Sequence, residues 1–372
     1  MRSRPTRFPL AVTVLLLLLT SCGTTAPSEP AAVRFTEVHL PGGATPVLVT
    51  SSNDALLIGV RRDGDRVVPG LLRRGPDGAV AEIAVHPAGN YGRQAYWYSL
   101  VADGERIVAV GGKRGGAHGN VRWSAWTGSD AGIAEQPQAF STFGGLGAGD
   151  LIDAVSTPAG PMLVGTWASE QVGLDVAVWT TDGRLWQRQP SAGTVLENTR
   201  ESLKFPMAAT SLGQGILVAG WGLSDGRQRA VVWRSTAGNT GWAMTPLPDP
   251  GRVGAAVAVR CSDSTCAVTG RVDGRLAVWR LTKDTWTRLP GVPRIPVADD
   301  AKPPAPVDVD GRLTQVITDG SGVTVAMAGN ERWTTRPAVG PSGQVTSVTR
   351  VGHTLYVVAG ERLWQTDVGS LA

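Results

Sequence analysis

The sequence predicts an all-β fold, a β-propeller whose repeat favours seven four-stranded blades. After residue 32, helical periodicity is nearly absent, and runs of aliphatic and β-branched residues alternate with turns. A strand that ends in a small residue and a glycine recurs, first at intervals of 50 to 59 residues and then after 31. The recurring glycines are Gly59, Gly111, Gly165, Gly220, Gly270, Gly329 and Gly360. Four strands in about 50 residues match the size of a propeller blade.

The first 21 residues have the pattern of a secretory signal. Arg2, Arg4 and Arg7 make the N-terminus basic, and an apolar run from Phe8 to Ser21 follows them. The run is short for a membrane span, because a helix needs about 20 apolar residues to cross a bilayer. We therefore expect this segment to direct export.

The residues Leu19-Thr20-Ser21-Cys22 resemble the lipobox of bacterial lipoproteins. The resemblance implies that the Cys22 thiol receives a diacylglycerol, that the signal is cleaved before Cys22, and that the new amino group is acylated. More than one acyl chain gives stable anchoring. We therefore expect a protein that is lipid-anchored to the cell membrane on its extracytoplasmic side. The alternative is an ordinary signal peptide, or an uncleaved anchor in which Cys22 has no role.

Processing would divide the chain into a signal at 1–21, a flexible tether at 22–32 and a single propeller domain at 33–372. The tether is small, polar and proline-containing, so it cannot bury apolar area. Loss of the signal removes three arginines, which changes 35 Lys and Arg against 31 Asp and Glu to 32 against 31. This balance argues against a nucleic-acid partner, which requires a clustered basic face. We expect a monomer.

Two further cysteines, Cys261 and Cys266, lie close together in the stretch RCSDSTCAV. In an exported protein such a pair indicates a disulfide, here one that closes a strand-turn-strand. A loop this small offers about 2 kcal/mol of stabilisation. A metal site is the alternative, but no histidine or second cysteine pair lies nearby at ligand spacing. We expect neither a metal nor another cofactor.

Asp-Gly pairs mark many of the predicted turns. A type I′ hairpin turn requires positive φ at both central residues, which Asp-Gly supplies. Calcium binding is the alternative for Asp308-Val309-Asp310-Gly311, although the glutamate of a calcium loop is missing at the required spacing. The eight pairs begin at Asp63, Asp77, Asp103, Asp182, Asp225, Asp273, Asp310 and Asp319.

Tryptophan pairs recur once per unit. The first member is expected on the third strand of a blade and the second at the start of the fourth strand. Large aromatic side chains repeated in this way fill the space between adjacent twisted sheets. A role in stacking on sugars would require the rings to be exposed on one face. The pairs are Trp179 with Trp186, Trp233 with Trp242, and Trp279 with Trp286.

Ring closure is expected to involve the two ends of the domain. The last unit supplies three strands, and residues 33–40 (VRFTEVHL) form a strand with no local partner. We predict that this strand is the outer strand of the blade containing residues 355–366, antiparallel to RLWQTDV, because closure hides an open sheet edge. In the sixth unit, LTQVITD is expected as the first strand, after a Pro-rich loop. Six or eight blades are the alternatives.

The hairpin VWTTDGRLW resembles the Asp-box of BNR and sialidase-type propellers. Thr180, Asp182, Gly183 and Trp186 match the motif in type, although the residue between Asp and Gly is missing. The resemblance implies a propeller and a turn that acts as a folding device rather than as an active site. The motif is more degenerate in the later units, where either the aspartate or the glycine is absent.

Catalysis of the sialidase type would require an arginine triad, a Tyr/Glu nucleophile pair and an acidic aspartate. Arg294-Ile295-Pro296 resembles the family's Arg-Ile-Pro motif, but it lies near the C-terminal end and in a Pro-rich loop. No tyrosine has an obvious glutamate partner, so no catalytic residue is predicted. We expect a binding or scaffolding role toward an unknown envelope protein or glycan. A glycan-acting hydrolase or lyase is the alternative.

The candidate binding face is formed by the loops that join the second strand to the third and one blade to the next. These loops share one face of a propeller, and long loops on a rigid scaffold commonly carry binding sites. Plain solvated loops are the alternative. The residues expected on this face are Tyr96, Tyr98, Lys113, Arg114, His118, Trp167, Trp221 and Arg227.

Overall fold

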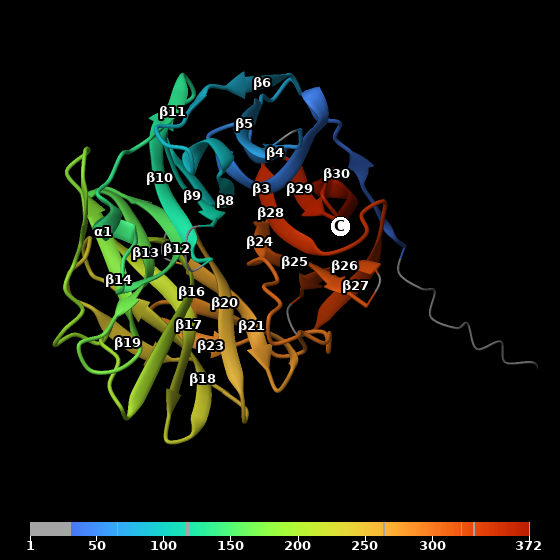
Figure 1. The fold of residues 1–372 in the computed structure, drawn as a ribbon. Helices are drawn as coiled ribbons and strands as arrows, with labels where there is room; N and C mark the ends of the chain where they lie inside the picture. The colour runs from blue at the N-terminus through green and yellow to red at the C-terminus, as the bar shows by residue number, and fades with distance from the viewer. Residues whose placement is uncertain are drawn as a thin grey trace, which may run out of the picture. The chain divides into compact units, whose positions relative to one another are not determined.

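The computed structural model describes residues 31–64, 66–115, 119–262, 265–320, 322–329 and 332–371. Within these ranges the chain forms seven β-sheets arranged as blades about a central axis (Figure 1), which confirms the predicted seven-bladed propeller. Among the described residues, no helix is both long and apolar enough to cross a membrane. The predicted signal and lipidation site, including Cys22, lie outside the described residues.

Five blades contain four strands each, and every strand is antiparallel to its neighbour in the sheet. The first comprises β3 (Ala44–Ser52), β4 (Ala55–Arg62), β5 (Val68–Arg74) and β6 (Val80–Ile83). The third comprises β12 (Ala148–Thr157), β13 (Gly160–Ala168), β14 (Leu174–Thr181) and β15 (Trp186–Arg188). The fourth comprises β16 (Ser202–Leu212), β17 (Gly215–Ser224), β18 (Arg227–Arg234) and β19 (Ala243–Pro246). The fifth comprises β20 (Gly254–Ser262), β21 (Thr265–Val272), β22 (Arg275–Thr282) and β23 (Thr285–Arg288). The seventh comprises β28 (Val345–Val351), β29 (Thr354–Ala359), β30 (Arg362–Asp367) and β2 (Thr36–Glu37).

The second and sixth blades carry a fifth, parallel strand on the outside. The second comprises β8 (Tyr96–Asp103), β9 (Arg106–Arg114), β10 (Val121–Ser129) and β11 (Gly132–Glu135), with β7 (Val85–His86) outside. The sixth comprises β24 (Val307–Val309), β25 (Arg312–Asp319), β26 (Gly322–Ala328) and β27 (Trp333–Val339), with β1 (Val33–Arg34) outside. The short helices are α1 (Phe140–Phe143), η1 (Pro41–Gly43), η2 (Gly92–Gln94) and η3 (Val368–Leu371).

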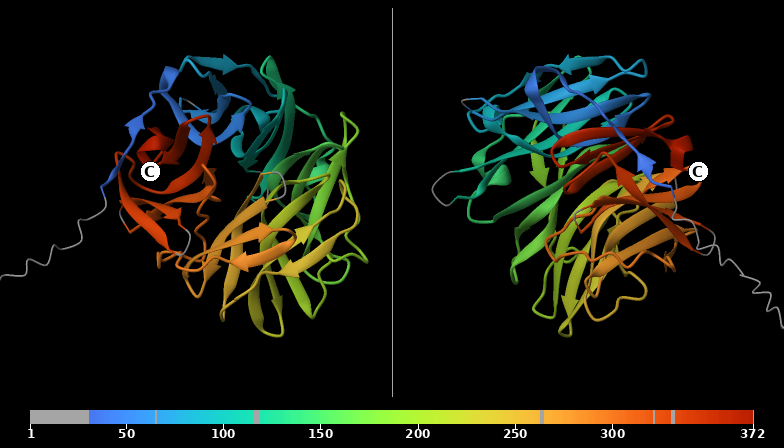
Figure 2. Two further views of the ribbon diagram at one scale, coloured as in Figure 1. Left: turned by 180° about the vertical axis from the view of Figure 1, so that it is seen from behind. Right: turned by 90° about the vertical axis from the view of Figure 1, so that its right-hand side faces the viewer.

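The N-terminal segment closes the ring. Thr36 and Glu37 pair with Gln365 and Trp364 in antiparallel register, as predicted for the last blade. The preceding strand β1 instead pairs in parallel with β27 of the sixth blade, which the sequence did not indicate. The segment therefore joins both blades, as the blue strand beside the red and orange blades shows (Figure 2).

The sixth blade departs from the predicted strand order. Its first strand is the three-residue β24, and LTQVITD belongs to the second strand, β25. Gly329 therefore follows the third strand, whereas Gly111 and Gly165 lie in the second strands of their blades. The Pro-rich context hides the short strand, because proline removes backbone donors and the pattern then suggests a loop.

A β-bulge in the first strand of six blades explains the recurring glycine. One residue of the first strand is skipped in the second, fourth and fifth blades, and two are skipped in the third. In these four blades the glycine of the second strand pairs with the residue just before a skipped one. A Cβ atom on Gly165 would lie 2.3 Å from the Asp150 carbonyl oxygen, which no side chain tolerates. The glycine thus permits the close approach of the bulged strand.

The tryptophan repeat is part of the core. Trp126, Trp179, Trp233 and Trp279 occupy the third strands of four successive blades and are fully buried. Each packs among aliphatic residues in a separate cluster between blades. This confirms the structural interpretation of the first tryptophan of each pair, since a ring buried between sheets cannot stack on a sugar.

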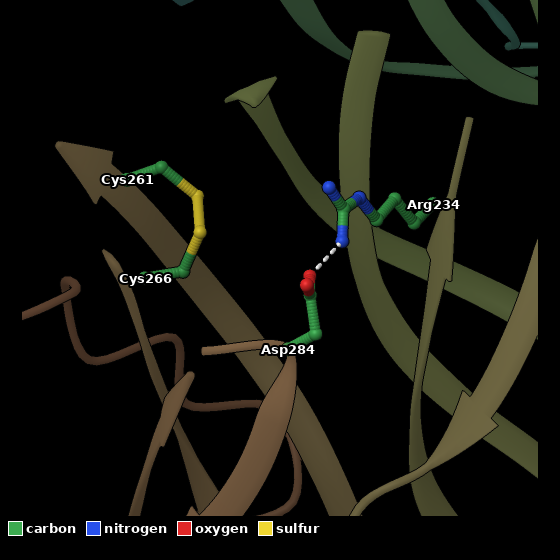
Figure 3. Close-up of a disulfide and its surroundings, with 4 residues drawn as sticks. All are labelled: Arg234, Cys261, Cys266 and Asp284. Carbon is green, nitrogen blue, oxygen red and sulfur yellow. Dashed lines mark hydrogen bonds and ion pairs between the residues drawn. A yellow bond between two sulfur atoms is a disulfide. The ribbon is translucent and has the colours of Figure 1, made fainter. Parts of the chain in front are cut away.

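The predicted disulfide joins Cys261 and Cys266 across the β20–β21 hairpin. The two residues pair directly in the sheet, and their Cα atoms lie 4.0 Å apart. Figure 3 shows the bridge near an ion pair of 2.6 Å between Arg234 of the fourth blade and Asp284 of the fifth. Cys266 is buried in a hydrophobic cluster that residues of the fourth and fifth blades form together.

Three of the eight Asp-Gly pairs have the positive φ at both residues that a type I′ turn requires. Both residues have positive φ at Asp225-Gly226, Asp273-Gly274 and Asp310-Gly311. At Asp182 only the following glycine does, and the Asp182 carboxylate accepts the backbone N–H groups of Arg184 and Leu185 at 2.9 and 2.8 Å. These hydrogen bonds lower the pKa of Asp182, and they give this aspartate the turn-forming role that the Asp-box resemblance implied.

Candidate functional site

Two adjoining cavities lie where the second blade meets the third. Their volumes are about 400 and 700 Å³, within the range of small-molecule and peptide pockets. Both are lined by Val121, Arg122, Trp123, Phe140 and Gly144. We call this pair of cavities the blade 2–3 cleft.

Helix α1, in the connection from the second blade to the third, forms one wall of the cleft. Phe143 at its end is buried and packs edge-on against Trp179, with ring centroids 6.0 Å apart. Phe140, at the start of the helix, is 61% exposed. One phenylalanine thus fixes the helix to the third blade, which leaves the other at the cleft.

Arg122, on β10, lies at the centre of the wall shared by the two cavities. Its guanidinium carbon is 4.6 Å from the ring centroid of Phe140 and 5.9 Å from that of Tyr91. Tyr91 comes from the loop that precedes the second blade, and it is half-exposed. Two aromatic rings from different connections therefore hold the arginine by cation–π contacts.

An aromatic cluster lies next to this arginine. The Tyr98 ring meets Trp123 edge-on at 4.8 Å and Tyr96 at 5.6 Å, and the Trp123 indole N–H donates to the Gly149 carbonyl of the third blade at 3.2 Å. Desolvation raises the pKa of both tyrosines, although Arg61 opposes the change at Tyr96 and Arg114 opposes it at Tyr98. The two phenols therefore remain neutral donors at physiological pH.

The structure brings together some of the predicted site residues. Tyr96, Tyr98 and Arg114 lie at or beside the blade 2–3 cleft, and Lys113 pairs directly with Arg122 across the strands. Trp167 packs against Trp179 and below Arg188 in the third blade. Trp221 stacks on Phe205 in the fourth, and Arg227 begins β18. His118 lies outside the described residues.

Sequence reasoning missed Arg122, Trp123, Phe140 and Tyr91 as a group. Tyr91 lies in a connection from one blade to the next, a kind of loop expected on the binding face, but the other three belong to a strand and to a short helix. The only signal was the stretch QAFSTFGGLG, in which an aromatic pair precedes a glycine run between two blades. Its meaning depends on which phenylalanine the neighbouring blade buries.

The first strands of the blades carry a second set of polar residues near the axis. The Asp153 carboxylate accepts hydrogen bonds from the Ser99 hydroxyl and from the N–H groups of Ala154 and Ala209, which joins the first strands of three blades. Desolvation raises the pKa of Asp153 to about 6, and these hydrogen bonds moderate the change.

Arg260, on β20, makes a contact across the axis. One terminal N–H donates to the Val348 carbonyl of the seventh blade at 2.6 Å. Desolvation lowers the pKa of Arg260 to about 10, so the guanidinium remains charged at neutral pH. Within the described ranges, no three His, Cys, Asp or Glu side chains are grouped so that they could hold a metal ion.

No family model matches the chain, and no curated protein matches it either. Among solved structures, the chain is similar to the β-propeller domain of the Trilobed protease from Pyrococcus furiosus. The TM-score is 0.54 at 8% identity, over 87% of this chain and 97% of that chain. It is also similar to virginiamycin B lyase from Staphylococcus aureus, with a TM-score of 0.53 at 15% identity, over 89% of this chain and 98% of that chain.

A sialidase from Trypanosoma rangeli also matches, with a TM-score of 0.46 at 10% identity, over 92% of this chain and 59% of that chain. This likeness is too low to carry an argument. Propellers of peptidases and lyases are among the matching structures, so the same architecture serves different activities. At these identities the comparisons establish the fold of this chain, a β-propeller.

Proposed function

We propose that this chain is a lipid-anchored, extracytoplasmic binding protein whose propeller holds its ligand in the blade 2–3 cleft. The observation that carries the proposal is the composition of the cleft. An arginine held between two exposed aromatic rings lines both cavities, and it stands on a rigid strand. Preorganised aromatic and arginine side chains are the residues that dominate binding energy at interfaces.

The anchoring part of the proposal rests on the sequence around Cys22. The signal-like segment and the lipobox resemblance support export and lipidation, and a disulfide is the expected state of a cysteine pair outside the cytoplasm. Replacing Cys22→Ser should move the protein from the membrane fraction to the medium, or leave it as unprocessed precursor. A variant that is processed and membrane-bound like the wild type would contradict lipidation.

The binding part can be tested without knowledge of the ligand. A small-molecule fragment library screened by ligand-observed NMR should give hits that are lost in Phe140→Ala, because that ring lines both cavities. Leu185→Ala is the control variant, because Leu185 is apolar and exposed like Phe140 but lines neither cavity. Hits that survive Phe140→Ala but disappear in Leu185→Ala would place the binding site elsewhere.

A glycan-acting hydrolase or lyase is the second candidate, and one observation favours it. A carboxyl group with its pKa raised to about 6 by burial, such as Asp153, is what a general acid requires. The hydrogen bonds to Ser99, Ala154 and Ala209 favour a structural role instead. Incubation with a panel of neutral and acidic polysaccharides, read out as new reducing ends or as absorbance of unsaturated products, tests this candidate. Activity that Asp153→Asn abolishes would replace the binding proposal.

A further inference from the structure

We propose that the occupant of the blade 2–3 cleft is an acidic peptide segment of a protein partner. Its carboxylates would be bound by Arg122 and the neighbouring cations, and its apolar side chains would pack on Phe140 and Leu146. This inference rests on the proposed binding function and specifies the chemical class of the ligand.

The Arg122 guanidinium is oriented by its surroundings but has no anionic partner among the described residues. Its contacts are the two aromatic rings, and within the described ranges no hydrogen bond or ion pair engages its N–H groups. Ring contacts leave the edges of a guanidinium available, and these edges match a carboxylate in a bidentate geometry. Because the rings already restrict the side chain, less entropy is lost when an anion binds.

Lys113 and Arg114 add positive charge close to Arg122. Lys113 lies directly opposite Arg122 in the β9–β10 pair, an arrangement of like charges that destabilises a sheet. Arg114, the next residue, projects from the opposite face of the sheet but also lines the larger cavity, and among the described residues it donates only to the Gly119 carbonyl at 3.1 Å. An anionic ligand would relieve this repulsion, since it would bring negative charge to a cluster that the described part of the chain leaves unpaired.

The two carboxylates of the cleft offset this cluster only in part. Glu135 accepts the backbone N–H groups of Ala88 and Gly89 at 2.6 and 2.9 Å, which ties it to the loop before the second blade. Asp150 lines the larger cavity and makes no ion pair within the described ranges. With both carboxylates counted, Arg122, Arg114 and the adjoining Lys113 give the cleft a net charge of +1, and the larger cavity, lined by Arg114, Arg122 and Asp150, carries the excess that would attract an anion.

The apolar residues at the rim favour a peptide. Leu146 is fully exposed and Phe140 is 61% exposed, and both line the larger cavity. Exposed aliphatic and aromatic side chains next to arginine are typical of protein interfaces. A peptide can cover them with side chains of its own while its acidic residues reach the cations.

Two amide side chains of the cleft are already engaged in the fold. The Gln136 amide accepts the Trp186 indole N–H at 2.6 Å and donates to the Gly183 carbonyl at 3.1 Å. The Gln138 amide accepts the Trp186 backbone N–H at 2.9 Å and donates to the Arg184 carbonyl at 3.1 Å. Both amides are therefore engaged in holding the third blade and are not available for sugar hydroxyls.

Fluorescence anisotropy with the full chain in detergent tests the proposal. The probe is a labelled peptide that alternates Asp or Glu with Leu or Phe, and its matched control carries Asn and Gln at the acidic positions. We expect the acidic peptide to bind at least tenfold more tightly than the neutral one. Arg122→Gln should weaken its binding at least tenfold, and Arg122→Lys should weaken it less, because the charge remains but the planar fork is lost.

Arg275→Gln provides the matched control for charge. Arg275 is an exposed arginine at the start of β22, the third strand of the fifth blade, and it lines neither cavity of the cleft, so its loss changes the net charge equally without touching the proposed site. Binding should change by less than twofold in this variant. Leu146→Ser should weaken the acidic peptide severalfold, which tests the apolar contact.

Three results would overturn the inference. Equal binding of the neutral and acidic peptides would exclude the charge complementarity, and equal loss in Arg122→Gln and Arg275→Gln would indicate nonspecific attraction. Arg122-dependent binding of oligogalacturonate in place of the peptide would assign an acidic glycan instead. Fragment hits that still depend on Phe140 would leave the binding function intact in each case, whereas their absence would remove that function as well.

Discussion

Gly220 and Phe205 approach each other so closely that a Cβ atom on Gly220 would lie 2.1 Å from the Phe205 carbonyl oxygen. Gly220 is in the second strand of the fourth blade, and Phe205 is in the bulged first strand. The same approach occurs in the fifth blade, where a Cβ on Gly270 would lie 2.0 Å from the Ala255 carbonyl oxygen. The glycine repeat is thus a packing requirement of the bulge.

Replacing Gly220→Ala should therefore destabilise the domain by about 1–3 kcal/mol, because the added methyl group forces the bulged strand to move. Gly222→Ala in the same strand is the matched control. Its Cβ would meet the nearest atom, the Leu203 carbonyl oxygen, at an ordinary 3.6 Å, so it should be neutral or stabilising by about 0.4–1 kcal/mol. Urea unfolding measures both. Equal stability of the two variants would refute the packing explanation.

Asp153 should make stability fall as the pH rises between about 4 and 6. Its folded-state pKa of about 6 lies above the ordinary value of 3.8. In this window the folded protein binds a proton that the unfolded chain has released, so unfolding becomes easier with rising pH. The free energy of unfolding should fall by an amount on the order of 2–3 kcal/mol over this window.

Urea unfolding at pH 4 and pH 6.5 should show this fall in the free energy of unfolding for the wild type. The fall should be lost in Asp153→Asn. The exposed turn variant Asp225→Asn should retain it, and the same pH dependence in both variants would rule Asp153 out as its source.

Deleting residues 33–40 should destabilise the whole domain in a single transition. Val33, Phe35 and Val38 are buried, and they belong to core clusters that involve the first, sixth and seventh blades. Burial of three such side chains contributes about 1.5–3 kcal/mol each. Calorimetry should show one endotherm at a much lower temperature, whereas deletion of the predicted tether residues 23–30 should leave melting unchanged. A 33–40 deletion that melts like the intact chain would contradict closure.

Removing the disulfide should lower the free energy of unfolding by about 2 kcal/mol, the amount expected for a loop this small. The double variant Cys261→Ser and Cys266→Ala suits the buried position of Cys266. Reducing agent should lower the melting temperature of the wild type to that of the double variant and leave the variant unchanged. Reductant-insensitive melting of the wild type would argue that the bridge contributes nothing to stability.

Much of the fold could be predicted from local sequence properties. The period-2 strands, the turns and the spacing of the glycines define the blades, because each blade is held by hydrogen bonds between strands that are adjacent in the chain. Thr36 could be assigned to the last blade by counting, because the last unit supplied three strands and a four-stranded blade requires one more. The sixth blade was misread because β24 has only three residues within a Pro-rich segment.

The cleft could not be predicted in this way. Arg122 and Phe140 meet because a strand of the second blade and the connection to the third come together only when the two sheets pack. Which phenylalanine of α1 is buried depends on the position of Trp179 in the neighbouring blade. The sequence by itself determined the repeat, the closing strand and the cysteine pair, whose interactions are local or countable. Only the tertiary structure decided the site, because side-chain exposure at a blade boundary is set by long-range packing.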